Sequence, residues 1–182
     1  MSATYPDKIQ FFRRMIQLPS TVRQRFIEAG WEPERLATVS DAVPAGHPAR
    51  DVFESFSGLT VVPDQEGEEC APNDLWFCEW FRDNPTTDSV ARTWNALLDT
   101  QLFAIAEVHR GHSVMYIATD GRCFGSSSIH DAFYFEGGSF TEAVERSLLG
   151  RRARPLLRPD QDAVRLYGDE FRADSPGVYH YR

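Results

Sequence analysis

Residues 126–131, Ser-Ser-Ser-Ile-His-Asp, contain the three side-chain types of a hydrolytic triad. In known triads the serine, the histidine and the acid come from separate segments and meet in space, so adjacency in the sequence is not their signature. The chain also lacks the Gly-X-Ser-X-Gly turn that presents a nucleophilic serine. We therefore interpret this stretch as a polar loop and keep a small hydrolase as the less favoured alternative.

The second candidate for chemistry is the pair His109 and His112, whose His-X-X-His spacing could place two imidazoles on one metal ion. Zinc sites need further ligands at characteristic spacings, and the chain has no His-Glu-X-X-His sequence. The three cysteines, Cys70, Cys78 and Cys123, have no Cys-X-X-Cys spacing, which argues against a zinc cluster and a disulfide framework. We predict no metal and no cofactor.

Motifs for nucleotide chemistry are also missing from the sequence. There is no phosphate-binding loop ending in Gly-Lys-Ser or Gly-Lys-Thr, and no Gly-X-Gly-X-X-Gly turn. The aromatic neighbours of Cys78 favour a buried, unreactive thiol over a nucleophile. These observations predict a protein that is not an enzyme.

Size and charge restrict the class of partner. The chain has 182 residues and a formal net charge of −8, which fits one domain and disfavours nucleic acid and anionic membranes as partners. No apolar run is long enough to cross a membrane, and the N-terminus has no signal-peptide pattern. We expect a cytoplasmic protein, a monomer or weak homodimer, with a basic protein partner.

The negative charge is concentrated in one segment. Residues 61–88 contain eight carboxylates and one arginine, nearly the whole net charge of −8. Carboxylates at this density accelerate association with a basic partner, and aromatic side chains beside them supply buried contacts. The alternative is a solvated loop whose aromatic residues turn inward. On the first interpretation, the binding residues are Asp64, Glu66, Glu68, Glu69, Asp74, Trp76, Glu79, Trp80 and Asp83.

Helices and strands that could position these residues are visible in the apolar pattern. Helical spacing predicts helices at residues 7–17, 20–30, 47–58, 88–99 and 140–150. Short apolar runs bounded by turn residues predict strands at 59–62, 101–108, 113–118, 122–126 and 131–138. Residues 75–81 could form a further strand with aromatic side chains on both faces, and a helix is the alternative there. This order indicates a single α+β domain with a central, mostly antiparallel β-sheet flanked by helices.

Several glycines have structural positions in this arrangement. Gly30 and Gly58 each fall one residue past a helical stripe, where a left-handed conformation is easiest for glycine. The bulky residue after each can fold back onto the last turn of its helix. We therefore assign structural roles, and no part in a binding site, to Gly30, Trp31, Gly58, Leu59, Gly121 and Gly150.

Four segments carry a resemblance to a known family: VRQRFIEAGWEPER at 22–35, HPARDVFESFSGLTVV at 47–62, LFAIAEVHRGHSVMYIATDGRCF at 102–124, and GGSFTEAVERSLLGRR at 137–152. In this order they resemble the third family of the SUKH (Smi/Knr-like) superfamily. The resemblance extends over about residues 20–154. It leaves residues 1–19 as an N-terminal helical extension and residues 155–182 as a C-terminal extension, which we expect to be loosely packed.

The resemblance implies a bacterial immunity protein. Such a domain is non-catalytic and binds and neutralises a cognate toxin domain, often a nuclease, of a polymorphic or contact-dependent toxin system. A nuclease must be basic to hold phosphates, so an acidic inhibitor can compete for the same surface. Because the superfamily also includes regulatory scaffold proteins, a protein-binding domain without a toxin is the alternative.

Overall fold

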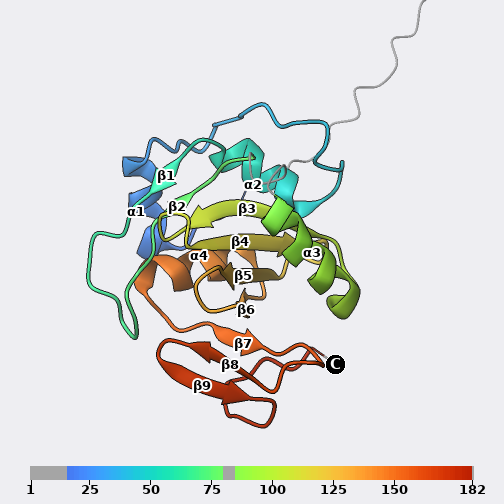
Figure 1. Cartoon of the computed structure of the whole chain (residues 1–182). Helices are drawn as coiled ribbons and strands as arrows, with labels where there is room; N and C mark the ends of the chain where they lie inside the picture. Colours follow the sequence, from blue (N-terminus) through green and yellow to red (C-terminus); the bar gives the residue numbers. More distant parts are fainter. Residues whose placement is uncertain (1–15, 80–84, 182) are drawn as a thin grey trace, which may run out of the picture.

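A seven-stranded β-sheet forms the centre of the computed structural model, which describes residues 16–79 and 85–181. Each strand pairs antiparallel with the next strand in the chain (Figure 1). The predicted α+β class with an antiparallel sheet is therefore confirmed. The strands are β1 (Thr60–Val61), β2 (Leu75–Trp76), β3 (Leu102–Val108), β4 (Ser113–Ala118), β5 (Cys123–Ser127), β6 (Ala132–Gly137) and β7 (Arg154–Leu156).

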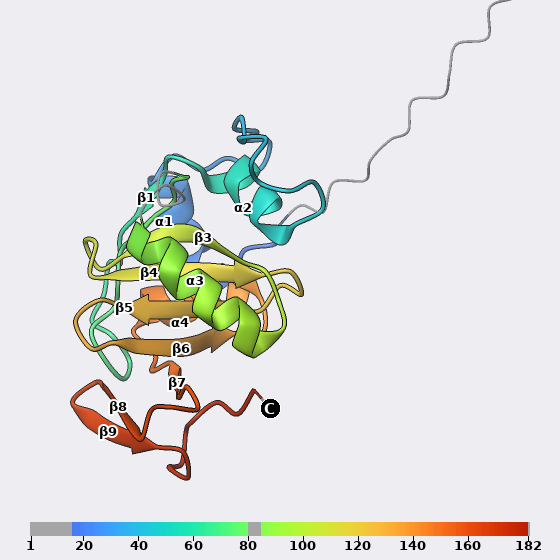
Figure 2. The same ribbon diagram turned by 45° about the vertical axis from the view of Figure 1, so that its right-hand side comes forward.

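Helices cover the two faces of this sheet unequally. Three helices lie against one face, and a single helix crosses the other face diagonally (Figure 2). The three are α1 (Ser20–Glu28), α2 (Pro48–Phe56) and α4 (Phe140–Leu149), and the single helix is α3 (Pro85–Leu98).

The alternation of side chains along β4 shows how the two faces differ. Met115 and Ile117 belong to the core beneath α1, α2 and α4, whereas Tyr116 and Ala118 belong to the core beneath α3. All four residues are buried, as expected for a central strand covered on both faces. The nearly continuous apolar run of β4 in the sequence is therefore explained by burial on both faces of the sheet.

Aromatic rings join the three helices on the larger core. The centroid of Phe56 on α2 lies 5.0 Å from that of Phe26 on α1 and 5.3 Å from that of Phe140 on α4. Full burial of side chains of this kind stabilises a fold by roughly 1.5–3 kcal/mol each. This cluster holds the helices in one position against the sheet.

The predicted glycine positions are confirmed by their backbone conformations. Gly30, Gly58, Gly121 and Gly150 all have positive φ angles. After α1, the N–H of Gly30 donates to the carbonyl of Ile27 and the next N–H donates to the carbonyl of Phe26, which is the Schellman arrangement. These four glycines therefore have the left-handed conformation that glycine adopts most easily.

The C-terminal extension is not loosely packed, so that expectation was wrong. Residues 154–156 form β7 on the edge of the sheet, and β8 (Ala163–Leu166) pairs with β9 (Asp169–Arg172) beside it. Val164 and Leu166 are buried because alternate residues of β8 face the core. This two-residue period was hidden among the polar and turn residues of the segment.

Two predicted elements extend beyond the described part of the chain. Most of the helix predicted at residues 7–17 falls on residues 1–15, which lie outside the described residues. The strand predicted at 75–81 is confirmed only for Leu75 and Trp76, and its last two residues lie outside the described residues as well.

Candidate partner-binding site

The acidic segment begins with a long loop, residues 62–74, that lies against the C-terminal end of α4. The backbone N–H of Glu68 donates to the carbonyl of Leu149 at 2.8 Å, and those of Glu69 and Cys70 both donate to the carbonyl of Gly150 at 2.9 Å. These bonds occupy carbonyls that a helix end leaves without intrahelical partners. The acidic loop is therefore attached to α4 through its main chain.

Gly150 makes this attachment possible. Its φ of +63° is in the left-handed region, and a Cβ atom there would lie 2.2 Å from the carbonyl oxygen of Cys70 and 2.7 Å from Cα of Gly67. Any larger residue at position 150 would push the acidic loop away from α4.

Three of the predicted binding carboxylates also hold the loop in place. Asp64 accepts a hydrogen bond from Nε of Arg25 at 2.6 Å, and Glu68 receives two from Arg151, at 2.7 and 3.2 Å. The hydrogen bonds from Arg151 lower the pKa of Glu68. Glu69 accepts a bond from a backbone N–H at 2.6 Å. These carboxylates have partners within the chain and yet remain exposed on their outer sides.

The other predicted residues have different surroundings. Glu66 is exposed, Asp74 is half-buried, and Glu79 accepts a hydrogen bond from the backbone N–H of Ser40 at 3.2 Å. Trp76 is 37% exposed, while its neighbours along the chain point into the core. Trp80 and Asp83 lie outside the described residues.

The β3–β4 turn adjoins this loop. A hollow of about 550 Å³ is lined by Val62, Asp74, His109 and His112, among other residues. The rings of the two histidines lie 5.5 Å apart, and the N–H of His109 donates to the carbonyl of Asp74. Among the residues that the structure describes, no group of three histidine, cysteine or carboxylate side chains is arranged to hold a metal ion.

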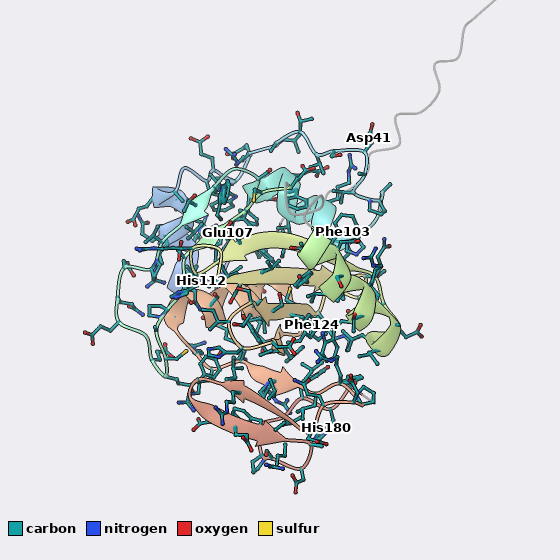
Figure 3. All side chains as sticks on the ribbon, in the orientation of Figure 1. Asp41, Phe103, Glu107, His112, Phe124 and His180 are labelled. Atoms are coloured by element: carbon teal, nitrogen blue, oxygen red, sulfur yellow. The ribbon has the colours of Figure 1, made fainter. Side chains whose placement is uncertain are left out.

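A larger groove, of about 590 Å³, lies on the other side of the same turn. One wall is the length of α3 from Thr87 to Leu97, and the floor and the other wall come from β4, β5 and the start of β6. Residues 158–160 complete its margin. His112 borders both the groove and the neighbouring hollow, at the end of the sheet where β3 turns into β4 (Figure 3).

The serines and the aspartate of residues 126–131 line this groove, but the histidine does not, and the three side-chain types form no triad. Oγ of Ser126 donates to the hydroxyl of Tyr116 at 3.4 Å, and Asp131 accepts a hydrogen bond from Arg158 at 3.2 Å. His130 is exposed and is not among the residues that line the groove. Burial raises the pKa of Tyr116 to about 12, so its hydroxyl stays protonated near neutral pH.

Sequence reasoning identified the acidic loop and missed the groove. The groove combines one face of α3 with polar residues at the ends of three strands, and these segments are far apart in the chain. The one available signal was the polar stretch at residues 126–128, which begins within the half-buried end of β5 and contributes to the groove wall.

No helix among the described residues has the length and apolarity needed to span a membrane.

Comparison with known proteins gives a match to one family model. No curated protein and no solved structure matched the chain. The model of the SUKH-3 immunity protein family matches residues 18–150, from the residues before α1 to the end of α4. This match extends over most of the sheet and over α1, α2, α3 and α4, and the chain belongs to the SUKH-3 immunity protein family.

Proposed function

We propose that this chain protects a bacterial cell by binding a basic toxin domain, a nuclease in the first instance, through its acidic surface. The observation that carries the proposal is membership in the SUKH-3 immunity protein family, which implies a toxin-neutralising role. The chain would act by occupying the toxin and not by catalysis. The proposed contact residues are Asp64, Glu66, Glu68, Glu69, Asp74, Trp76, Glu79, Trp80 and Asp83.

Charge supports a basic partner. The chain carries a net charge of −8, and most of it lies in the acidic segment. An active site that holds phosphates must be basic, so the two surfaces attract each other over roughly 10 Å at moderate salt. This attraction accelerates encounter more than it increases final affinity.

The internal ion pairs of the acidic loop suit this role. Asp64 and Glu68 contact arginines of the same chain, but their side chains are still 57% and 46% exposed. A carboxylate already held in one position loses less rotamer freedom when a partner binds. The loop therefore presents preorganised charge, and Trp76 beside it offers a partly exposed aromatic contact.

Co-expression tests the proposal directly. The toxin domain encoded beside the gene for this chain would be expressed with and without it, and survival and co-purification would be measured. We expect survival only with the chain present, together with a stable complex. Equal killing in both cultures, with no complex, would reject the immunity role.

A second step separates binding from catalysis. The complex would be dissociated in urea, and the refolded toxin would be assayed alone. Recovered toxin activity supports neutralisation by occupancy, whereas a permanently inactive, covalently altered toxin would show that the chain is an enzyme. Co-purification of a basic protein that is not a toxin would favour the scaffold alternative.

A further inference from the structure

We propose that the groove beneath α3 is the anchoring site for one extended, basic segment of the toxin. This inference rests on the proposed function and goes beyond it, because the acidic loop supplies attraction and the groove supplies the enclosed contact.

The dimensions of the groove fit an extended peptide. Thr87, Val90, Trp94 and Leu97 all line it from one face of α3. At about 1.5 Å per residue, this wall is roughly 15 Å long. An extended chain advances about 3.3 Å per residue, so four or five residues would lie along the wall.

The floor of the groove offers a place for one apolar side chain. Trp94 stacks on Phe133 with ring centroids 4.3 Å apart and an interplanar angle of 12°. Both rings line the groove, and both are almost fully buried, at 2% and 3% exposure. They form a rigid surface, with Val114 beside them on β4. Because both rings are already buried in the free chain, a bound side chain would contact mainly the half-buried Val90, Leu97 and Val114 that also line the groove.

The wall opposite α3 carries hydroxyl groups. Ser113, Ser126 and Ser127 line the groove from β4 and β5, and Tyr116 presents its hydroxyl near Ser126. Each serine already has one partner within the chain: Ser126 donates to Tyr116, Ser127 accepts from the N–H of Ile129, and Ser113 bonds Tyr134. A hydroxyl has one donor and two acceptor positions, so each serine keeps capacity for a further bond to the main chain of an extended peptide. Such a wall suits a peptide better than a purely apolar ligand.

Charge at the margin selects a basic residue. Arg158 contacts Asp131 at 3.2 Å and Asp160 at 3.5 Å, and these carboxylates are 81% and 80% exposed. Two carboxylates around one guanidinium leave a net negative charge at this end of the groove. A lysine or arginine of the bound segment would therefore be favoured next to its apolar anchor.

The groove also continues towards the acidic loop. His112 lines the groove on one side and the hollow containing Asp74 on the other. A toxin segment seated against α3 would therefore leave the groove beside the acidic surface. The two regions can contact one partner at the same time.

Selection of peptides on the full-length chain tests this inference without the toxin. A phage-displayed library of random heptapeptides would be selected on the wild-type chain, and the enriched peptides would be synthesised for affinity measurements. We expect sequences in which lysine or arginine adjoins an aromatic or aliphatic residue. Enrichment of acidic sequences, or no enrichment, would overturn the proposal.

Variants locate the bound peptide. Thr93 is an exposed residue on the α3 wall, so Thr93→Trp fills the groove without disturbing the core, and we expect affinity to fall about tenfold or more. Ser126→Trp fills it from the opposite wall and should have the same effect. Thr119→Trp, at an exposed turn outside the groove, is the matched control and should bind normally. Unchanged binding by the folded Thr93→Trp chain would overturn the proposal.

Charge and function are then tested separately. Asp131→Asn with Asp160→Asn should weaken peptide binding about two- to fivefold at low salt, and Asp174→Asn, an exposed control, should not. In the co-expression assay, a toxin neutralised equally by wild type and by Thr93→Trp would refute the groove while leaving the immunity role intact. A toxin that the wild-type chain fails to neutralise would refute the immunity role, and with it the toxin as the occupant.

Discussion

The acidic loop and the groove beneath α3 both contain polar groups that are paired within the chain, but the surroundings of these pairs differ. In the loop, Asp64 and Glu68 turn at least one oxygen inward to an arginine, and the main chain is bonded to the end of α4. In the groove, the serines and the Asp131–Arg158 pair surround an open hollow. Density of charge in a sequence therefore says little about how much of that charge is available to a partner.

The two regions also depend on different parts of the fold. The loop depends on α1 and α4, which lie on one face of the sheet, whereas the groove depends on α3, which lies on the other. They meet at the turn between β3 and β4, where His112 borders both. Substitutions can therefore perturb one region while the other serves as an internal control.

The largest expected effect comes from detaching the loop. Gly150→Ala introduces a Cβ atom 2.2 Å from the carbonyl oxygen of Cys70 at a position with φ of +63°. We expect the free energy of unfolding to fall by about 3 kcal/mol, from backbone strain and displacement of the loop together. Urea denaturation measures this change.

A matched substitution isolates the contribution of the loop contact. Gly168→Ala also places alanine at a positive φ, +82°, but no atom lies within 4 Å of the new Cβ. Only the backbone strain remains, so the loss should be about 1 kcal/mol. Equal losses in the two variants would mean that the loop is not held by its close approach to Gly150.

The second prediction concerns pH and a buried acid on the loop side of the sheet. Glu136 on β6 is buried, and burial raises its pKa from 4.5 to about 8, an effect partly opposed by Arg146. Between these values the unfolded chain loses a proton that the folded chain retains, so this residue makes stability fall as pH rises from about 4.5 to about 8.

Glu136→Gln removes this dependence. We expect the variant to gain stability relative to the wild type as pH rises, by on the order of 2 kcal/mol at pH 8, with little difference near pH 4.5. Thermal or urea unfolding at several pH values provides the measurement. A constant difference across the range would show that Glu136 does not titrate in this window.

The third prediction compares ion pairs in the two regions. Arg25 is 5% exposed and binds Asp64 in the loop, whereas Arg92 and Asp88 on α3 are 70% and 51% exposed. A double-mutant cycle with Arg25→Met and Asp64→Asn should give a coupling energy of about 1 kcal/mol. The same cycle at Arg92 and Asp88 should give about 0.3 kcal/mol. Equal coupling energies for the two pairs would contradict the prediction that the partly buried Arg25–Asp64 pair stabilises the fold more than the exposed pair on α3.

The smallest effect is on association with the toxin. Glu66→Gln with Asp74→Asn neutralises two carboxylates that are not paired with an arginine in the described structure. We expect association at low salt to slow about threefold and the difference to shrink at high salt. Stopped-flow mixing measures the rate, and Glu34→Gln with Asp174→Asn is the control of equal charge elsewhere. An identical rate for all three proteins would exclude the loop from steering.

The sequence was informative where local rules decide the structure. The helix ends at Gly30 and Gly150 follow from chemistry within a few residues, and the structure has both where expected. The apolar runs of β3 and β4 are likewise long enough to identify without tertiary information. Local signals were therefore sufficient for the fold class and for most element positions.

The candidate site was less predictable because it depends on contacts distant in the chain. Arg25 and Asp64 are 39 positions apart, and nothing in either neighbourhood indicates that they pair. Thr93 and Ser126 line the same groove only because α3 crosses the sheet at one particular angle. The sequence shows how many carboxylates the acidic segment contains. Only the folded structure shows which of them contact arginines of the same chain and which face solvent.

The edge strand β7 affects how readily two copies of the chain could associate through the sheet. An uncovered edge strand offers free N–H and C=O groups on which another chain can build. Pro155 in β7 has no N–H to offer, and its carbonyl already accepts a hydrogen bond from the N–H of Tyr179 at 2.9 Å. The last residues of the chain thus turn this edge of the sheet into a poor template for a second copy.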